Sequence, residues 1–580
     1  MDNMQAVYTE VNNCQDCYKC IRECPVKAIK IESDRASIVK DLCIFCGRCT
    51  LICPSGAKKV RDDVSRVKRM LRRSRPVYIS LAPSFVSEFS DFTPQSLVAG
   101  IKKLGFTGVS ETALGAELVT ASTSEFLQES GPGIYISTAC PSAVDYIRKY
   151  KPELAKSLVG LQSPLMAHAS MMRRWYGETI RVVFIGPCVA KKTESDDFPS
   201  LIDAALTFND LRRWFEEEGI FPELTCASVD DDFVPTRAYD GALYPLDGGM
   251  VSTLKSNGNT AGVNFMHISG IGNIKQALAG IDKIDPASKL FLELLVCEGG
   301  CVNGPGTSAK EGTIVKNLRV DQYRNSPKLP VKEGNLITGI PDIRTPYCIV
   351  TQSQKDKFWA EDDIQEALKT AGKSSTADEL NCGGCGYNSC RDFAIAMLNG
   401  MAERQMCVSY MRKVATDKAS VLLQRMPYGV VLVDDRLHVI ESNKIFADLI
   451  GNDAAMLWDA KPGLKGADMR KMIGFHKVFA NVLSSGNDLI DRNVDENGRL
   501  LNLSVFTIQR HRIICGIIQD LHQPGLMQEE VMRRIRQVVH ENMGTVQKVA
   551  YLLGENAART ETMLNALVNN PVKDSANEQG

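Results

Sequence analysis

Eight cysteines near the start of the chain fall into two groups with the same spacing. The segments CQDCYKCIRECP and CIFCGRCTLICP each end in a proline, Pro25 and Pro54. Gaps of two residues let three thiolates surround one face of an iron-sulfur cubane, and the fourth cysteine reaches across to a second cluster. Paired zinc sites would instead be expected from two separated CxxC pairs. The spacing therefore predicts one cluster on Cys14, Cys17, Cys20 and Cys53, and another on Cys43, Cys46, Cys49 and Cys24.

A third cysteine group follows far downstream, in NCGGCGYNSC and beyond, with gaps of two, four and sixteen residues. The last gap, RDFAIAMLNGMAERQM, has apolar residues at helical intervals, so we expect a loop to supply three thiolates and a helix to carry the fourth back. This group resembles the small single-cluster domain of corrinoid-linked and ferredoxin-oxidising enzymes, with a zinc site as the alternative. The doubled N-terminal pattern resembles a bacterial two-cluster ferredoxin over residues 8–57. The predicted ligands of the third group are Cys382, Cys385, Cys390 and Cys407.

Four further cysteines lie in the middle of the chain, too far apart to form a local metal finger. They occur in TACP, GPCVAKKTE and ELLVCEGGCVNGPG, so only the tertiary fold could bring them together. These three segments resemble the signature segments of FeFe-hydrogenases, in the same order. APSF at 82–85 and YPLDGGM at 244–250 also resemble that family, and the resemblance spans residues 76–340. The four cysteines are Cys140, Cys188, Cys297 and Cys301.

The resemblance implies a role for each residue at these positions. The four central cysteines would hold a 4Fe-4S cubane, and Cys301 would also bridge to a diiron subsite that bears CO, cyanide and a dithiolate amine and is made by separate maturases. Cubane and subsite together form the family's H-cluster. Lys191 matches the lysine that donates a hydrogen bond to one cyanide, and a cationic donor suits an anionic ligand. Pro83 and Ser84 match the turn that caps the other cyanide, while the alternative for Lys191 is an ordinary surface lysine.

Several positions depart from the family pattern, and three of the departures remove proton carriers. Ala139 stands where efficient hydrogenases have a cysteine that passes protons to the bridgehead amine. A methyl group cannot exchange a proton, and losing a positioned acid or base typically costs roughly 10² to 10⁴ in rate. Ser122 and Thr123 align with proton-path glutamates. Methionines of the diiron pocket are replaced by Gly186 and Leu295, and Pro305 interrupts a glycine run.

The C-terminal third predicts a separate domain. YGVVLVDDRLHVIESNKIFADLIG indicates strand, turn, strand and then a helix capped by Ser442 or Asn443. Further strand-like segments follow, and the order resembles a PAS domain, a sensory and dimerising fold, over residues 415–522. The histidines of this region could bind haem, but solvated or core positions are the favoured interpretation: His438, His476 and His511.

A helical tail is predicted after this domain. Val531, Ile535 and Val538 begin a run of alternating four- and three-residue steps, typical of a short coiled coil that pairs with another copy. His540 faintly resembles the phosphoacceptor of sensor kinases, although a surface histidine is favoured because no ATP-binding domain follows it. Any output would therefore pass through a separate protein, such as a kinase or phosphatase.

The bulk properties agree with a multidomain protein of mixed α+β and α/β class. A chain of 580 residues exceeds a single core, and its formal net charge of −1 gives no general attraction to nucleic acid or anionic membrane. The first residues, MDNMQAVYTE, lack the pattern of a secretion signal, so we expect a cytoplasmic protein in which 19 cysteines bind metal rather than form disulfides. The expected domains are a two-cluster ferredoxin-like domain (1–60), a catalytic domain (76–340), a single-cluster domain (341–413), a PAS domain (415–522) and a helical dimerisation or output tail (523–580).

Three hypotheses for function follow from these motifs. The favoured one is a hydrogen-sensing FeFe-hydrogenase of low turnover, whose substrates are H2 and protons and whose three 4Fe-4S clusters outside the active site report to the PAS domain. The second is a conventional hydrogenase that exchanges electrons with ferredoxin. The third is a hydrogenase-like iron-sulfur assembly or electron-transfer protein without the diiron subsite. A homodimer is expected, with no nucleic acid or membrane partner.

Overall fold

The computed structural model divides the chain into two compact units, Met1–Arg412 and Lys413–Gly580. The predicted helical tail, including its coiled-coil positions and His540, lies outside the described residues. Among the described residues, no helix is long and apolar enough to cross a bilayer. The structure describes residues 5–32, 35–228, 230–256, 260–326, 340–345, 358–496 and 498–521.

The N-terminal segment (residues 5–60) repeats one small motif twice. In each half, a CxxC sequence is followed by a one-turn helix whose N-cap residue has a left-handed backbone, Tyr18 with φ 53° and Gly47 with φ 73°. Two short antiparallel pairs of strands complete the segment. Its elements are β1 (Val7–Thr9), α1 (Lys19–Glu23), β2 (Ile29–Glu32), β3 (Arg35–Ile38), α2 (Arg48–Ile52) and β4 (Lys58–Val60).

The central segment (residues 64–326) contains two parallel sheets, of order β6-β5-β8-β9 and β10-β11-β7. Strands such as VYISL and AALT are near-continuous apolar runs, as expected for parallel strands covered on both faces. The strands are β5 (Val77–Leu81), β6 (Gly108–Glu111), β7 (Gly133–Ile136), β8 (Arg181–Gly186), β9 (Ala204–Thr207), β10 (Asn264–Ser269) and β11 (Lys289–Leu295).

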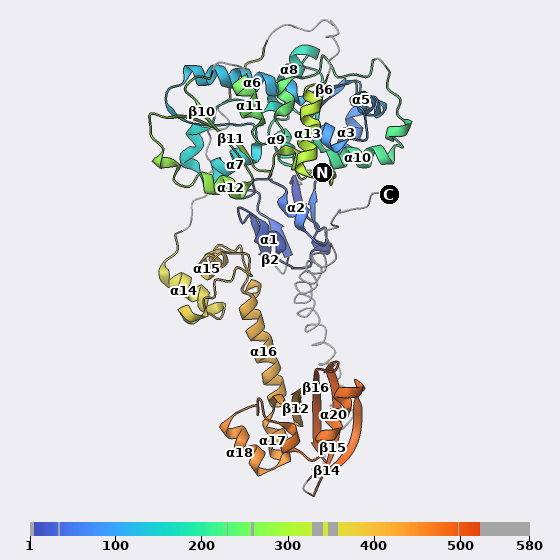
Figure 1. Cartoon of the computed structure of the whole chain (residues 1–580), viewed down its shortest axis with the longest axis vertical. Coiled ribbons are helices and arrows are strands. Elements are labelled where there is room, and N and C mark those ends of the chain that lie inside the picture. Colours follow the sequence, from blue (N-terminus) through green and yellow to red (C-terminus); the bar gives the residue numbers. More distant parts are fainter. Residues whose placement is uncertain are drawn as a thin grey trace, which may run out of the picture. The chain divides into compact units, whose positions relative to one another are not determined.

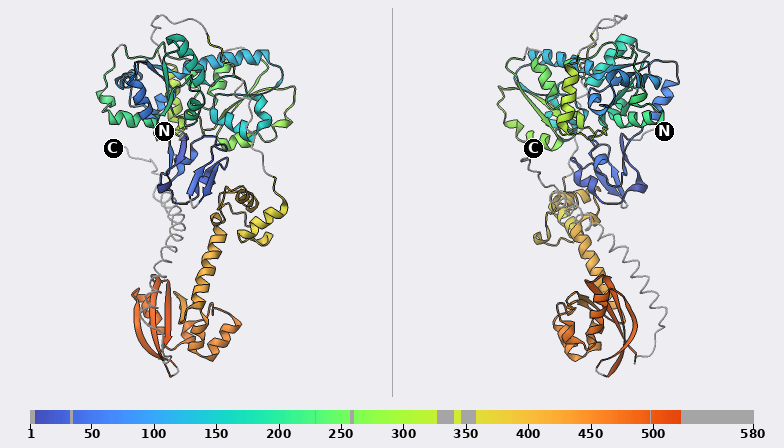
Figure 2. Two further views of the ribbon diagram at one scale, coloured as in Figure 1. Left: turned by 180° about the vertical axis from the view of Figure 1, so that it is seen from behind. Right: turned by 45° about the vertical axis from the view of Figure 1, so that its right-hand side comes forward.

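Helices pack around both sheets (Figures 1 and 2). For example, α8 contacts β5 and β8, and α10 contacts β8 and β9, so the four-stranded sheet is covered by apolar side chains such as Leu165 and Leu211. The helices are α3 (Val64–Leu71), α4 (Phe85–Glu88), α5 (Pro94–Lys103), α6 (Thr112–Glu129), α7 (Pro141–Tyr150), α8 (Pro164–Tyr176), α9 (Ala190–Asp197), α10 (Phe208–Glu217), α11 (Gly249–Ser256), α12 (Ile271–Ala277) and α13 (Thr313–Arg324).

The small segment (residues 358–412) contains the third cysteine group. Its helices are α14 (Glu361–Thr370) and α15 (Cys390–Leu398), and Ser389 caps α15 by accepting from the amide of Asp392. The structure differs from the sequence prediction here, because α15 ends before Gly400, whose φ is 68°, and does not carry Cys407. Cys407 instead directly precedes α16 (Val408–Arg425).

The second unit contains a five-stranded antiparallel sheet of order β13-β12-β16-β15-β14. Of the two cap residues that the sequence predicts, Ser442 and Asn443, the structure has Asn443 as the cap of the helix that follows it. Its Oδ1 accepts hydrogen bonds from the amides of Phe446 (3.0 Å) and Val430 (2.8 Å), which joins the helix start to a strand. The elements are β12 (Gly429–Asp434), β13 (Val439–Ser442), α17 (Lys444–Ile450), α18 (Asn452–Ala460), α19 (Met469–Met472), α20 (His476–Ser485), β14 (Leu489–Glu496), β15 (Arg499–Gln509) and β16 (Ile513–Asp520).

Candidate metal centre

One cavity of about 100 Å³ in the central segment is lined by all four of its predicted cysteine ligands. They reach it from loops at the carboxyl ends of parallel strands, where open α/β sheets generally bind ligands. Cys140 follows β7, Cys188 follows β8, and Cys297 follows β11. The fold thus gathers cysteines that lie up to 161 positions apart in the sequence, Cys140 and Cys301.

Local backbone features fix the loops that carry these thiols. Cys140 is the N-cap residue of α7, and Pro141 occupies the first helical position, where its fixed φ is compatible with a helix start. Cys297 and Cys301 are separated by a tight turn in which Gly299 and Gly300 have φ of 73° and 96°. A side chain at Gly300 would collide with the backbone oxygen of Pro245, so the turn requires glycine there.

Lys191 lies at this cavity and is not a surface lysine. Its side chain is buried, with 7% of the residue exposed. The ammonium group donates to Ser163 Oγ (2.9 Å) and to Glu194 Oε2 (2.7 Å), the latter from the next turn of α9. A lysine held in this way presents a positive charge beside the cysteines without the cost of an unpaired buried ion.

Pro83 and Ser84 also line the cavity, in the turn that leads from β5 into α4. The Ser84 hydroxyl is buried and has no hydrogen-bond partner within the described part of the chain. A buried hydroxyl without a partner costs free energy, so this one is available to a bound polar group. Four thiols, a cationic lysine and an available hydroxyl therefore fit an anionic iron-sulfur group with further polar ligands.

The departures from the family pattern occupy different places. Ala139 and Leu295 line the cavity, whereas Ser122 and Thr123 lie on α6 and do not. The space beside Gly186 is filled by Phe184, whose ring would overlap any side chain placed at Gly186. The thiol that Ala139 lacks has no evident substitute among the described cavity-lining residues.

Two polar features near the cavity were not predicted from the sequence. Thr112 lines the cavity and begins a buried chain of hydrogen bonds through Ser80 (2.7 Å) to His168 (2.8 Å) and on to Ser110 (2.9 Å). Burial lowers the pKa of His168 to about 3, so its ring is neutral. The signal in the sequence was that Ser80 is a polar residue in an otherwise apolar strand, VYISL.

Glu293 is the second such feature, a carboxylate in the apolar strand LFLELL. Its oxygens accept from the amides of Val251 (2.9 Å) and Met250 (3.3 Å) at the start of α11. Burial nevertheless raises the pKa of Glu293 to about 7, more than those two hydrogen bonds lower it.

The cavity thiols are held in a strongly desolvated environment. Burial raises the pKa of Cys188 to about 11 and shifts the pKa values of Cys140, Cys297 and Cys301 in the same direction. Free thiols here are therefore protonated at neutral pH, and binding of iron must displace the protons. Among the described residues, no three His, Cys, Asp or Glu side chains are close enough to hold a single metal ion.

The N-terminal segment reaches the same cavity. Phe45 and Cys46 line it, and Phe45 packs in an apolar cluster with Val189 and Ala190, at the start of α9. Cys43, Cys49 and Cys188 border that cluster. The loop that would carry one ferredoxin-like cluster is thus packed directly against the loop that carries Cys188.

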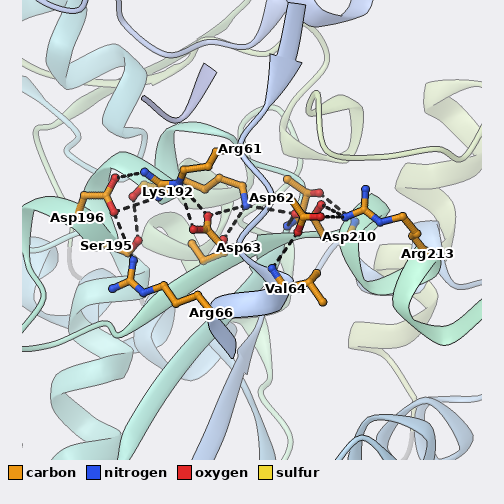
Figure 3. Close-up of polar contacts among 12 residues, drawn as sticks. Arg61, Asp62, Asp63, Val64, Arg66, Lys192, Ser195, Asp196, Asp210 and Arg213 are labelled. Atoms are coloured by element: carbon orange, nitrogen blue, oxygen red, sulfur yellow. Dashed lines mark hydrogen bonds and ion pairs between the residues drawn. The ribbon is translucent and has the colours of Figure 1, made fainter. Parts of the chain in front are cut away.

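A network of ion pairs joins α9 to residues 61–63, which follow the N-terminal segment (Figure 3). Lys192 is fully buried and donates to Asp63 (3.1 Å), Asp210 (3.2 Å) and the carbonyl of Ala205 (2.8 Å). Arg61 binds Asp63 and also forms a bidentate pair with Asp196 at the end of α9 (2.7 and 3.0 Å). The two consecutive lysines of GPCVAKKTE therefore act on different sides of the helix. Lys191 lies at the cavity, and Lys192 binds Asp63 in residues 61–63.

The three histidines considered as possible haem ligands, His438, His476 and His511, each have a local contact in the second unit. His476 Nδ1 lies 3.1 Å from the carbonyl of Ile473, and His511 Nδ1 lies 2.9 Å from that of Leu483. His438 lies 3.8 Å from Asp434.

Three family models match parts of the chain. Residues 75–305 match the C-terminal domain of the iron-only hydrogenase large subunit, residues 13–58 match a 4Fe-4S dicluster domain, and residues 378–409 match a putative Fe-S cluster.

Curated relatives are similar at low identity. Iron hydrogenase 1 of Clostridium pasteurianum is 25% identical over 329 residues, covering 47% of this chain and 57% of that protein. The NADP-reducing hydrogenase subunit HndD of Solidesulfovibrio fructosivorans is 22% identical over 391 residues, covering 54% and 66%. The nuclear prelamin A recognition factor of Xenopus laevis is 20% identical over 411 residues, covering 58% and 90%. The chain spans less than two thirds of the length of the first two relatives. It is a hydrogenase-like iron-sulfur protein, related at low identity to the FeFe-hydrogenases, with a dicluster ferredoxin-like segment at residues 13–58.

Proposed function

We propose that this chain is a hydrogen-sensing FeFe-hydrogenase that interconverts H2 and protons at low turnover. The observation that carries the proposal is the composition of the cavity, in which four cysteines and Lys191 meet but Ala139 takes the place of a proton-carrying thiol. Ligands and charge are retained, while the group expected to exchange protons rapidly is missing. This combination favours detection of hydrogen over fast catalysis.

Each described side chain has a distinct task in this proposal. Cys140, Cys188, Cys297 and Cys301 would hold a cubane, and Cys301 would also hold the diiron subsite. When bound, that subsite supplies the chemistry of binding and splitting H2. Lys191 is oriented by Ser163 and Glu194 to donate to one cyanide. On the other side, Ser84 offers its free hydroxyl to the second cyanide, in the turn formed with Pro83.

Electrons leave through the N-terminal segment. Phe45 and Cys46 border the cavity, so a cluster on Cys43, Cys46, Cys49 and Cys24 would lie next to the cubane. The second cluster, on Cys14, Cys17, Cys20 and Cys53, would follow. A ferredoxin-like protein is a suitable external redox partner for this relay.

The second unit supports a sensory output. The sheet order β13-β12-β16-β15-β14, with four helices between β13 and β14, is the arrangement expected of the proposed PAS domain. Such a domain would report the redox state of the relay to a separate kinase or phosphatase, as a homodimer.

A second candidate is an electron-transfer or assembly protein that holds only cubanes. The ring of Phe184 fills the space next to Gly186, so the methionine that the family pattern places at the diiron pocket is absent here. The similarity to the nuclear prelamin A recognition factor extends over 90% of that protein. It is consistent with a hydrogenase-like protein whose function is not hydrogen conversion.

The deciding experiment is infrared spectroscopy of the anaerobically matured chain while hydrogen is added and withdrawn. We expect CO and cyanide bands that shift reversibly with hydrogen, together with slow turnover. Absence of these bands after verified maturation would favour the cubane-only candidate. Fast turnover would instead indicate a conventional ferredoxin-linked hydrogenase.

A further inference from the structure

The small segment is docked directly on the N-terminal segment. The amide of Ile31 in β2 donates to the carbonyl of Met401 (3.2 Å). Side chains from both segments share one buried apolar cluster, with Cys20 and Ile21 from one side and Cys407 from the other. Two regions that each carry cluster ligands are therefore packed together.

The closest approach is at Gly386, directly after the predicted ligand Cys385. A Cβ at Gly386 would lie 3.0 Å from Ile21 Cγ2 and 3.2 Å from the backbone nitrogen of Arg22, and φ is 94°. Only glycine permits this backbone conformation and this distance without strain. The Cys385 loop thus lies against α1, the helix that contains Cys20 and is followed directly by Cys24.

Tyr387 lies at this contact with an unused hydrogen-bond donor. The residue is 7% exposed, its ring packs on Phe393 with centroids 5.9 Å apart, and its hydroxyl has no partner among the described residues. A buried hydroxyl that lacks an acceptor destabilises the fold, so an acceptor is expected where iron-sulfur clusters are bound.

We propose that the docked segments form an electron-transfer contact, in which the Tyr387 hydroxyl donates to a sulfur of the cluster on Cys382, Cys385, Cys390 and Cys407 and makes that cluster the electron acceptor of the relay. One electron passes from a reduced cluster of the N-terminal segment, which is oxidised, to this cluster, which is reduced; no bond is broken. Hydrogen bonds to cluster sulfurs stabilise the reduced, more negative state and so raise the potential. The inference rests on the part of the proposed function that assigns 4Fe-4S clusters to these cysteines, and does not depend on the diiron subsite.

The first test is Tyr387→Phe, with Tyr410→Phe as the control from the same segment. The full chain, reconstituted anaerobically with iron and sulfide, is titrated with a reductant while each cluster is followed by electron paramagnetic resonance. We expect one midpoint potential to become more negative in Tyr387→Phe alone, with iron content unchanged. Equal potentials in Tyr387→Phe and the parent chain, at full iron content, would overturn the proposal.

The second test perturbs the contact without removing the hydroxyl. Gly386→Ala introduces the clash with α1, whereas Gly383→Ala is a matched control, since Gly383 also has positive φ (68°) but its nearest neighbour would be 3.8 Å away within its own loop. We expect the magnetic coupling between neighbouring reduced clusters to weaken only in Gly386→Ala. Unchanged coupling would overturn the contact. Both readouts are obtained without maturation, so absent CO and cyanide bands would refute the diiron proposal and leave this one standing.

Discussion

Replacing Lys192 with methionine tests whether the network in Figure 3 holds α9 in place. The side chain is fully buried and satisfies three acceptors, on Asp63, Asp210 and Ala205. Methionine has a similar length but no charge, so the change leaves two carboxylates, 5% and 7% exposed as residues, without their shared cation. Removing one partner of a buried ion pair typically costs about 3–5 kcal/mol.

The structure indicates that the lower end of this range applies. Asp63 keeps Arg61, and Asp210 keeps the amide of Thr207 (2.8 Å), so neither carboxylate is left entirely without a donor. A cost of about 3 kcal/mol raises the equilibrium constant for local opening around α9 a little over 100-fold, because 1.36 kcal/mol is a factor of ten in an equilibrium constant. The chain has several domains and is not expected to unfold in two states, so a local measurement is required.

Hydrogen exchange of the full chain, followed by mass spectrometry, provides that measurement. In Lys192→Met we expect peptides covering residues 190–197 and 204–210 to exchange about 100-fold faster than in the parent chain. The matched control is Arg213→Met, which removes a half-exposed member of the same network and should cost under about 1 kcal/mol. Exchange within threefold of the parent, or equal effects of both variants, would refute the reasoning.

Three further predictions concern the cavity. Because burial raises the pKa of Glu293 from 4.5 to about 7, the folded chain retains a proton that the unfolded chain loses, so stability falls as pH rises through that window. This loss of stability is worth at most about 3 kcal/mol. Glu293→Gln, whose side chain cannot titrate, should abolish it, as measured by thermal melts of the metal-free chain at both ends of the pH window. Lys191→Met should shift the cyanide bands of the matured chain while its cluster resonances persist, and unshifted bands would place the cyanide elsewhere. Ala139→Cys should raise hydrogen evolution per loaded site substantially, toward the roughly 10² to 10⁴ in rate that a positioned acid or base typically supplies; an unchanged rate in the fully loaded chain would remove proton relay as the explanation for slow turnover.

The four central cysteines were predictable through the resemblance of their sequence segments to the FeFe-hydrogenase signatures, not through local spacing. The predicted positions of Cys140, Cys188, Cys297 and Cys301 meet at one cavity, even though only the tertiary fold could bring them together. The alternation of strands and the Asn443 cap in the second unit were also predictable, since both depend on residues close in sequence. The interpretation of Lys191 as buried at the cavity likewise agrees with the structure.

Long-range packing was not predictable in the same way. The helix in the small segment was predicted to carry Cys407, but apolar periodicity cannot show that Gly400 ends it. Glu293 and Thr112 gave no spacing signal, because each depends on a partner from a distant element, α11 or β5. The docking of Gly386 on α1 has the same origin, since it depends on the fit of two surfaces more than 360 residues apart in the chain.

The departures from the hydrogenase pattern separate into two kinds when their neighbours are considered. Gly186 is compensated by Phe184, whose ring takes the space that a larger side chain would need. Pro305 is explained by the N-terminal segment, because its Cγ would lie 2.6 Å from a Cβ at Gly47, so glycine and proline accommodate each other where the two segments meet. Both changes preserve packing and have no direct consequence for proton exchange. Ala139 differs, since it lies at the cavity and its methyl group has no acidic hydrogen to exchange. If the site is loaded as proposed, we therefore expect proton transfer at this position to limit its rate.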